Sequence, residues 1–284
     1  MPSDTAVGGL ACHVSGTGTP LLMLHGIISD SSFFTECAEL LSHFYTVITY
    51  DRRSYGQSRS RDYTDYSVHT QAEDAARILS ALTDEPAFIL GNSAGGLIGL
   101  ELALSHPNLV RGLLMIEPSL GYDPADREKL LAWNRTLNGY AETGQYKQVL
   151  PEFARTIGGS TREATSTMAD LRRTFQNLNA FMEGELNEVQ HYLPNADRLA
   201  ALKTPAALAV TERGRESIFA TSTVSAAQYT GLPLFHLPGY HNVVQDFPQD
   251  AAVTIHGIFE SMQKGLFPPR TYTKKENMPC EKKS

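Results

Sequence analysis

The chain has 284 residues, is 42% hydrophobic and 19% charged, and carries a formal net charge of −7 at pH 7. This length and composition allow a substantial apolar core, which excludes a disordered polypeptide and suits one large domain or a domain with an insertion. The acidic balance gives no basic footprint, so we expect neither nucleic acid nor a membrane surface as a partner.

The cysteines and the first residues indicate a compartment. Cys12, Cys37 and Cys280 are widely spaced and odd in number, which fits neither a disulfide framework nor a metal-binding pattern. Such usage is typical of a reducing compartment. The opening MPSDTAVGG lacks the basic start and apolar stretch of a signal peptide, and no apolar run is long enough to span a bilayer. We therefore expect a cytoplasmic protein.

Short apolar runs alternate with amphipathic segments in the first part of the chain. The runs contain consecutive hydrophobic residues, which is typical of strands buried on both faces. Ser67 precedes one amphipathic segment and is a suitable helix N-cap. The alternation predicts an α/β fold in which a mostly parallel sheet is covered by helices on both faces. The expected strands lie within 20–26, 44–58, 86–96 and 109–118, and the expected helices within 67–82 and 97–107.

The pattern changes after Pro118, because residues 120–202 contain helical stretches and no convincing strand. The sheet and helix pattern then resumes within 204–214, 232–239 and 247–264. An insertion between two strands, at the end of the sheet that carries the loops, is where lids and specificity loops belong. We therefore divide the chain into a core (1–119 and 203–267), a helical cap (120–202) and a polar C-terminal tail (268–284) that we expect to be flexible.

The segment GNSAG, Gly91 to Gly95, matches the G-x-S-x-G nucleophile elbow and stands between a predicted strand and a predicted helix. An elbow holds its serine in strained backbone geometry with the hydroxyl pointing away from the sheet, and its glycines allow backbone segments to approach closely. The helix that begins near Ala94 directs its N-terminal N–H groups to the same place, where they would stabilise an oxyanion. Ser93 is therefore the candidate nucleophile, and the alternative is a small-residue turn that only packs a helix on a strand.

Four motifs in this order resemble the α/β-hydrolase superfamily over nearly the whole chain. LLMLHG resembles the family's third strand and oxyanion loop, and DRRSYGQS resembles its D-x-R-G-x-G-x-S turn, with Ser54 in place of one glycine. GNSAGG is the elbow, and LPGYHN resembles the histidine loop after the eighth strand. The resemblance implies the branch of the superfamily that has a serine nucleophile and a helical lid. The serine in the elbow excludes the branch whose nucleophile is an aspartate.

The resemblance also implies roles for individual residues. Ser93 would be the nucleophile, and His241 would be its base and then the acid for the leaving group. The N–H groups of Ile27 and Ala94 would form the oxyanion hole. His25 fits a packed residue that shapes the oxyanion loop. Because no cluster has metal-ligand spacing and no G-x-G-x-x-G follows a strand at a useful place, we expect neither a metal nor another cofactor.

The acid of a triad is harder to place. The family usually carries an aspartate after its seventh strand, where this chain has Gly214, and the nearby Glu212 and Glu216 fit solvated loop charges. Glu117, in contrast, ends an apolar run, where a carboxylate needs a partner. Some members of the superfamily carry the acid after the sixth strand, often as a glutamate followed by proline, and MIEPS locally resembles fungal lactone hydrolases that act on zearalenone. We therefore expect Glu117 to pair with His241, with Glu212 and Glu216 as alternatives.

The cap aromatics serve mostly the packing of the cap itself, and Trp133 and Tyr192 are our candidates for substrate contact. A cap of this size favours a medium-sized, mostly apolar small molecule in an enclosed site. We expect a carboxylesterase or lactonase that cleaves an ester or lactone through an acyl-enzyme. A lyase or carbon–carbon bond hydrolase with the same triad, or a small-molecule receptor on a hydrolase fold, stays open. Neither the substrate's identity nor the oligomeric state follows from the sequence.

Overall fold

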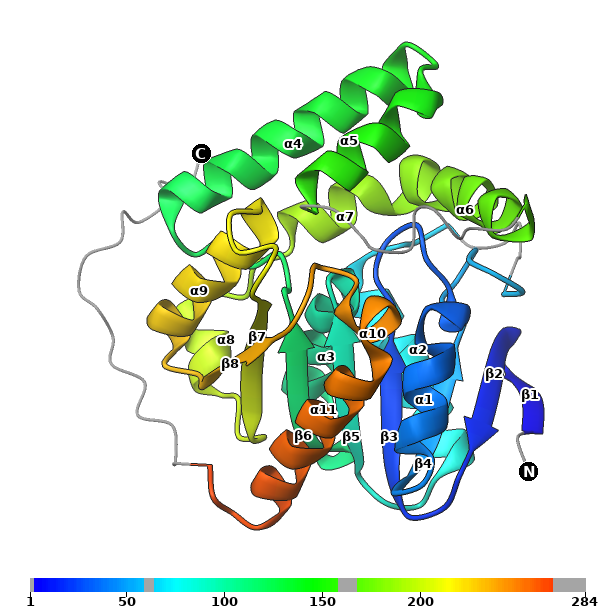
Figure 1. Cartoon of the computed structure of the whole chain (residues 1–284), viewed down its shortest axis with the longest axis vertical. Coiled ribbons are helices and arrows are strands. Elements are labelled where there is room, and N and C mark those ends of the chain that lie inside the picture. Colours follow the sequence, from blue (N-terminus) through cyan, green and yellow to red (C-terminus); the bar gives the residue numbers. More distant parts are fainter. Residues whose placement is uncertain (1–2, 59–63, 158–167, 268–284) are drawn as a thin grey trace.

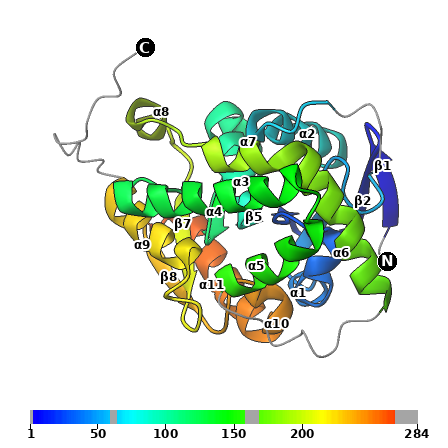
Figure 2. The same cartoon turned by 90° about the horizontal axis from the view of Figure 1, so that it is seen from above.

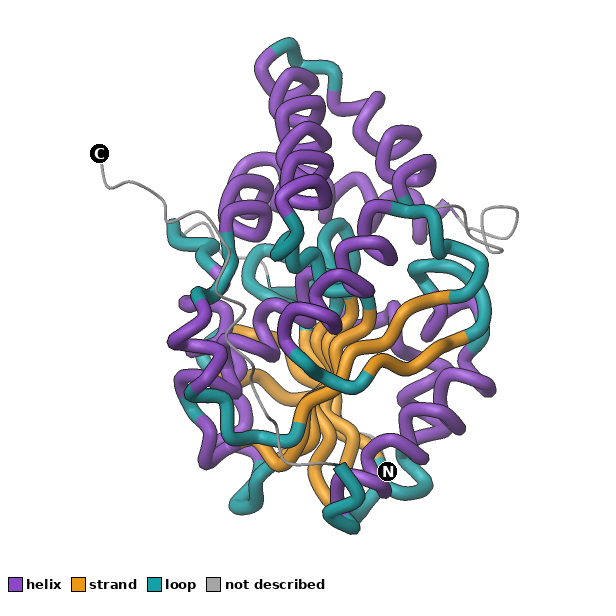
Figure 3. The backbone as a smooth tube through the Cα atoms, turned by 90° about the vertical axis from the view of Figure 1, so that its left-hand side faces the viewer, coloured by secondary structure: helices purple, strands orange, loops and turns teal. Residues whose placement is uncertain are grey.

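A computed structural model describes residues 3–58, 64–157 and 168–267, and these residues contain an eight-stranded sheet with the order β1-β2-β4-β3-β5-β6-β7-β8. Neighbours from β4 to β8 pair in parallel, whereas β2 pairs antiparallel with both β1 and β4. The sheet is strongly twisted (Figure 3). The strands are β1 (Ser3–Val7), β2 (Leu10–Ser15), β3 (Thr19–Leu24), β4 (Tyr45–Tyr50), β5 (Ala87–Asn92), β6 (Val110–Ile116), β7 (Ala206–Thr211) and β8 (Leu234–Leu237). The α/β class predicted from the sequence is confirmed.

Helices cover both faces of the sheet (Figure 1). Because the central strands are apolar on both sides, each face has its own buried cluster: Leu114 and Phe259 of α11 belong to one, and Leu113 and Leu79 of α2 belong to the other. Ser67 caps α2 as predicted, since its Oγ accepts a hydrogen bond from the N–H of Thr70 at 3.1 Å. One face carries α1 (Thr35–Leu41), α10 (Val243–Asp246) and α11 (Pro248–Gln263), and the other carries α2 (Val68–Leu82), α3 (Ala94–Ser105) and α9 (Ile218–Thr230).

The described residues between β6 and β7 form helices, most of which lie over one end of the sheet (Figures 1 and 2). The first of them begins after Asp123, whose side chain accepts hydrogen bonds from the N–H groups of Ala125 and Asp126, with Pro124 at the first helical position. These elements fall within the range expected for the cap. They are α4 (Pro124–Glu142), α5 (Val149–Thr156), α6 (Met168–Ala180), a π-helical turn (Phe181–Glu185), α7 (Leu186–His191) and α8 (Ala196–Ala200).

Two features differ from the sequence-based expectation or lie beyond it. The β1–β2 hairpin was not predicted, because β1 is exposed and its sequence SDTAV contains no apolar run. The π-helical turn lies among the helical stretches that the sequence predicts within 120–202, and the sequence pattern did not indicate it. The tail, residues 268–284, lies outside the described residues. No helix in the described part of the chain is long and apolar enough to cross a membrane.

Candidate active site

Ser93 stands between the end of β5 and the start of α3. Its backbone has φ 54° and ψ −124°, a conformation that is strained for a residue with a side chain. Its N–H donates to the carbonyl oxygen of Ile116 at 2.8 Å, which ties the turn to the neighbouring strand. A Cβ atom at Gly95 would lie 2.0 Å from the carbonyl oxygen of Leu24, so only glycine fits there. The turn thus has the geometry expected of a nucleophile elbow.

The two backbone N–H groups expected to stabilise an oxyanion lie beside this serine. Ala94 is the first residue of α3, so its N–H has no partner within the helix. Ile27 lines the same pocket as Ser93, and a Cβ atom at the preceding Gly26 would lie 3.1 Å from Ser93 Cβ. Among the described residues, neither N–H is engaged by a backbone carbonyl outside the regular elements. Both groups are therefore available to a negative charge that develops near Ser93.

His241 follows β8 and is bound to Glu117. The distance between His241 Nδ1 and Glu117 Oε2 is 2.6 Å, and the two side chains are 1% and 0% exposed. Because the carboxylate accepts a hydrogen from Nδ1, the lone pair that a base needs is on Nε2. That nitrogen is buried without a hydrogen-bond partner in the described part of the chain, and His241 lines the same pocket as Ser93. The ring is therefore held in the tautomer that suits a general base.

The second oxygen of Glu117 is held by Thr211, the last residue of β7. Glu117 Oε1 accepts hydrogen bonds from the Thr211 N–H at 2.8 Å and from Thr211 Oγ1 at 2.5 Å. The backbone of Glu117 has φ 44°, and its N–H donates to the carbonyl oxygen of Ala209 at 3.0 Å. A buried carboxylate is tolerated only when donors surround it, and here His241 supplies one donor and Thr211 two.

The usual position of the acid lies close to the histidine loop but carries no side chain. A Cβ atom at Gly214 would lie 3.8 Å from the backbone nitrogen of His241 and 2.9 Å from Thr211 Oγ1. Glu212 and Glu216, on either side, are exposed. Of the three carboxylates considered from the sequence, Glu117 is the one that the structure brings onto His241 within the described residues.

A pocket of about 520 Å³ contains Ser93 and His241. It is bounded by the oxyanion loop (residues 25–29), the 3₁₀ turn Ser31–Phe34, the start of α10, and cap helices α5 and α6. Apolar side chains of Ile28, Phe33 and Phe153 share it with polar side chains of Asn92, Arg173 and Asn177. This lining is more polar than a mostly apolar substrate requires. No group of three or more His, Cys, Asp or Glu within the described ranges is placed to hold a metal ion.

The two cap aromatics expected to contact substrate do not line this pocket. Trp133 packs edge-on against Phe219, with ring centroids 5.5 Å apart, and Phe219 lies 4.8 Å from the ring of His241. The hydroxyl of Tyr192 donates to Oε2 of the buried Glu101 on α3, at 2.7 Å. Phe219 therefore lies between Trp133 and His241, and the Tyr192 hydrogen bond joins the cap to the core.

Sequence reasoning missed two supporting residues of this site. Thr211 could have been predicted. Parallel pairing aligns Ile116 with Ala209, so the ends of β6 and β7 carry Glu117 and Thr211 side by side. Phe219 gives no comparable signal, because one aromatic residue on a helix is indistinguishable in sequence from an ordinary core residue.

The chain is similar to known hydrolases. The family described as alpha/beta hydrolase fold matches residues 19–198. The uncharacterised hydrolase YraK of Bacillus subtilis (strain 168) is 25% identical over 261 residues, which cover 88% of this chain and 92% of YraK. Fluoroacetate dehalogenase of Burkholderia sp. is 34% identical over 110 residues, 37% of this chain and 36% of the dehalogenase. The crystal structure of a hydrolase from Pseudomonas aeruginosa PA01 matches with a TM-score of 0.72 at 20% identity, covering 91% of this chain and 98% of that one.

Proposed function

The chain belongs to the α/β-hydrolase fold family, and we propose that it is a serine hydrolase that cleaves an ester or lactone bond through an acyl-enzyme. The observation that carries the proposal is the Glu117–His241 contact of 2.6 Å in a pocket that also contains Ser93. A carboxylate on Nδ1, a free Nε2 and a serine in an elbow are the parts that acyl transfer needs. The strained backbone of Ser93 adds support, because such strain clusters at functional sites.

In the proposed reaction, His241 Nε2 takes the proton from Ser93 Oγ as that oxygen attacks the carbonyl carbon. The carbonyl oxygen becomes an oxyanion between the N–H groups of Ile27 and Ala94. The imidazolium, stabilised by Glu117, then gives its proton to the leaving alkoxide. Water attacks the acyl-enzyme with His241 again as the base, and the carboxylic acid leaves as Ser93 Oγ regains its proton.

The pocket supports a narrower substrate class than the sequence did. A volume of about 520 Å³ lies within the usual range for small-molecule sites. Polar side chains of Arg173, Asn177 and Asn92 line its wall, and Asn92 Oδ1 is buried without a hydrogen-bond partner among the described residues. We therefore propose a medium-sized ester or lactone that carries hydroxyl, amide or carboxylate groups, in place of the mostly apolar molecule that the cap alone suggested.

The test compares wild type with Ser93→Ala. Wild type should hydrolyse a chromogenic p-nitrophenyl ester and gain the mass of one fluorophosphonate adduct, whereas Ser93→Ala should do neither at a comparable rate and should keep its melting temperature. An active wild type without an adduct would contradict the acyl-enzyme. A wild type that binds small esters but never turns them over would favour a receptor on this fold.

A further inference from the structure

The peptide between Gly26 and Ile27 is held on its carbonyl side. The Gly26 oxygen accepts hydrogen bonds from His25 Nδ1 at 2.9 Å and from Arg52 Nη2 at 2.8 Å. Nδ1 is the donor, because His25 Nε2 accepts from the Arg52 N–H at 3.0 Å. In a trans peptide the carbonyl and the following N–H point in opposite directions. These two bonds therefore set the direction of the Ile27 N–H, one of the two proposed oxyanion donors.

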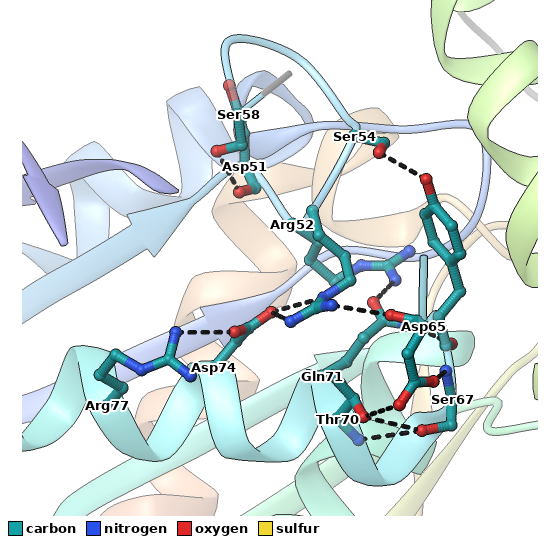
Figure 4. A network of polar contacts seen from close by, with 12 residues as sticks. Asp51, Arg52, Ser54, Ser58, Asp65, Ser67, Thr70, Gln71, Asp74 and Arg77 are labelled. Carbon is teal, nitrogen blue, oxygen red and sulfur yellow. Dashed lines mark hydrogen bonds and ion pairs between the residues drawn. The ribbon is translucent and has the colours of Figure 1, made fainter. Parts of the chain in front are cut away.

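The same Arg52 side chain reaches the cap. Its guanidinium forms an ion pair with Glu185, where Nη1 bonds Oε1 and Nη2 lies 3.2 Å from Oε2. Gln71 of α2 accepts from Arg52, as Figure 4 shows, and donates to Glu185 Oε1 at 2.8 Å. The hydroxyl of Tyr55 donates to Glu185 Oε2. One cap carboxylate is thus bound by three side chains of the core.

This ion pair lies in the protein interior. The side chains of Arg52 and Glu185 are 1% and 0% exposed. Burial alone would lower the pKa of Arg52, but the Glu185 carboxylate raises it above its usual value. Glu185 ends the π-helical turn between α6 and α7, and such turns are frequent at functional sites. The carboxylate that neutralises the buried Arg52 is therefore supplied by the cap.

We propose that Glu185 and Arg52 are positioning residues that couple the docking of the cap to the oxyanion hole. With Glu185 in place, Arg52 holds the Gly26 carbonyl and the Ile27 N–H faces the pocket. When the cap lifts, Arg52 loses its carboxylate and keeps Gln71 and Gly26 as partners, so the Gly26 carbonyl is held less firmly. Cap closure then completes the oxyanion hole as well as enclosing the substrate. This inference rests on the proposed serine-hydrolase function.

The coupling predicts a loss of transition-state stabilisation without a loss of substrate binding. Glu185→Gln keeps the side chain's size but removes its charge. On a p-nitrophenyl ester, kcat should fall by about tenfold to a hundredfold, less than for deletion of an oxyanion donor, while KM changes by less than about twofold. The Ki of a boronic acid, which forms a tetrahedral adduct on the serine, should rise by the same factor as kcat falls.

Arg198→Gln is the matched control, because it also breaks an ion pair between cap and core. Arg198 binds the buried Glu101 through Nη1 at 2.9 Å and Nη2 at 3.0 Å and has no bond to Gly26. This variant should lower the melting temperature but keep kcat and the boronic acid Ki within about twofold of wild type. The coupling is refuted if Glu185→Gln keeps wild-type kcat and Ki. It is also refuted if kcat falls as far in Arg198→Gln as in Glu185→Gln.

Two further measurements keep the outcome decisive. If Glu185→Gln does not fold, Tyr55→Phe replaces it, since this change removes one hydrogen bond to Glu185 and keeps the ion pair. It should lower kcat by about threefold and raise the boronic acid Ki equally, and wild-type values for both would overturn the proposal.

If wild type itself neither reacts with a fluorophosphonate nor hydrolyses esters, the proposed function fails. If wild type reacts and Glu185→Gln reacts equally fast, only the coupling fails.

Discussion

Glu117 Oε2 lies 2.6 Å from Nδ1 of His241, although the two residues are 124 positions apart in the chain. The contact joins the end of β6 to the loop after β8, and Thr211 at the end of the intervening β7 holds the other carboxylate oxygen. Because the ends of these parallel strands meet at one edge of the sheet, an acid after the sixth strand reaches the histidine as well as one after the seventh.

Glu117→Gln tests whether this contact serves catalysis. The amide keeps the side chain's size but no longer favours the Nδ1–H tautomer or stabilises the imidazolium. We expect kcat on a p-nitrophenyl ester to fall by about a thousandfold or more, with KM within about twofold of wild type. Steady-state kinetics on the purified variant give both values.

Glu212→Gln and Glu216→Gln are the controls for this change, since both side chains are exposed in the loop that carries the acid in other members of the family. Each should stay within about 0.5 kcal/mol of wild type in unfolding free energy and near wild type in rate. If kcat falls as far in either control as in Glu117→Gln, the acid is assigned to the wrong strand.

Thr211→Val separates the two donors that hold Glu117. The change preserves shape and the backbone N–H but removes the hydroxyl that donates to Glu117 Oε1 at 2.5 Å. We expect the unfolding free energy to fall by about 1–2 kcal/mol, because a buried carboxylate loses a donor. The rate should fall by about threefold to tenfold, since His241 and the Thr211 N–H still orient the acid. Urea unfolding and kinetics measure the two effects, and an unchanged stability would show that this hydroxyl does not stabilise the carboxylate.

The sequence predicted the core of the fold because its signals there are local and redundant. Continuous apolar runs mark the central strands, and the glycines around Ser93 mark a turn in which a Cβ atom would collide with the backbone. Glu117 was recognisable because a carboxylate at the end of a buried strand demands a partner. The β1 strand, which is polar and exposed, gives no such signal.

The arrangement of the cap was not predictable in the same way. A helical pattern identifies the helices of the cap but not the face that each turns toward Ser93, so the choice of Trp133 and Tyr192 rested on residue type alone. Docking depends on buried polar contacts between residues far apart in sequence, such as Glu185 with Arg52, which lie 133 positions apart. Local periodicity carries no information about such pairs.

Tyr192→Phe and Phe153→Ala distinguish an anchor of the cap from a wall of the pocket. Tyr192→Phe removes a hydrogen bond to the buried Glu101, so we expect a loss of about 1–2 kcal/mol in stability and unchanged KM. Phe153 lines the pocket, so Phe153→Ala should change KM for esters of different acyl size. A series of p-nitrophenyl esters provides the comparison, and a KM effect confined to Tyr192→Phe would show that Tyr192 contacts substrate after all.

The buried His25 makes stability depend on pH. Burial, and next the neighbouring Arg52 charge, lower the pKa of His25 from 6.5 to about 3. The folded protein therefore keeps a neutral imidazole between Arg52 and Gly26, whereas the unfolded chain takes up a proton below pH 6.5. The stability contributed by this residue is full above pH 6.5 and is lost as the pH falls toward about 3, at up to about 1.4 kcal/mol per pH unit.

His25→Gln removes the titrating group and isolates its contribution. At neutral pH this variant should be less stable than wild type, because glutamine does not reproduce both hydrogen bonds of the imidazole. Between about pH 7.5 and about pH 5, wild type should lose about 2 kcal/mol more than His25→Gln, since only wild type has this proton to exclude. Urea unfolding of both proteins at the two pH values gives the difference. Equal losses of unfolding free energy would mean that His25 takes up a proton as readily in the folded protein as in the unfolded chain. The Gly26 carbonyl would then be held by a cationic ring beside Arg52.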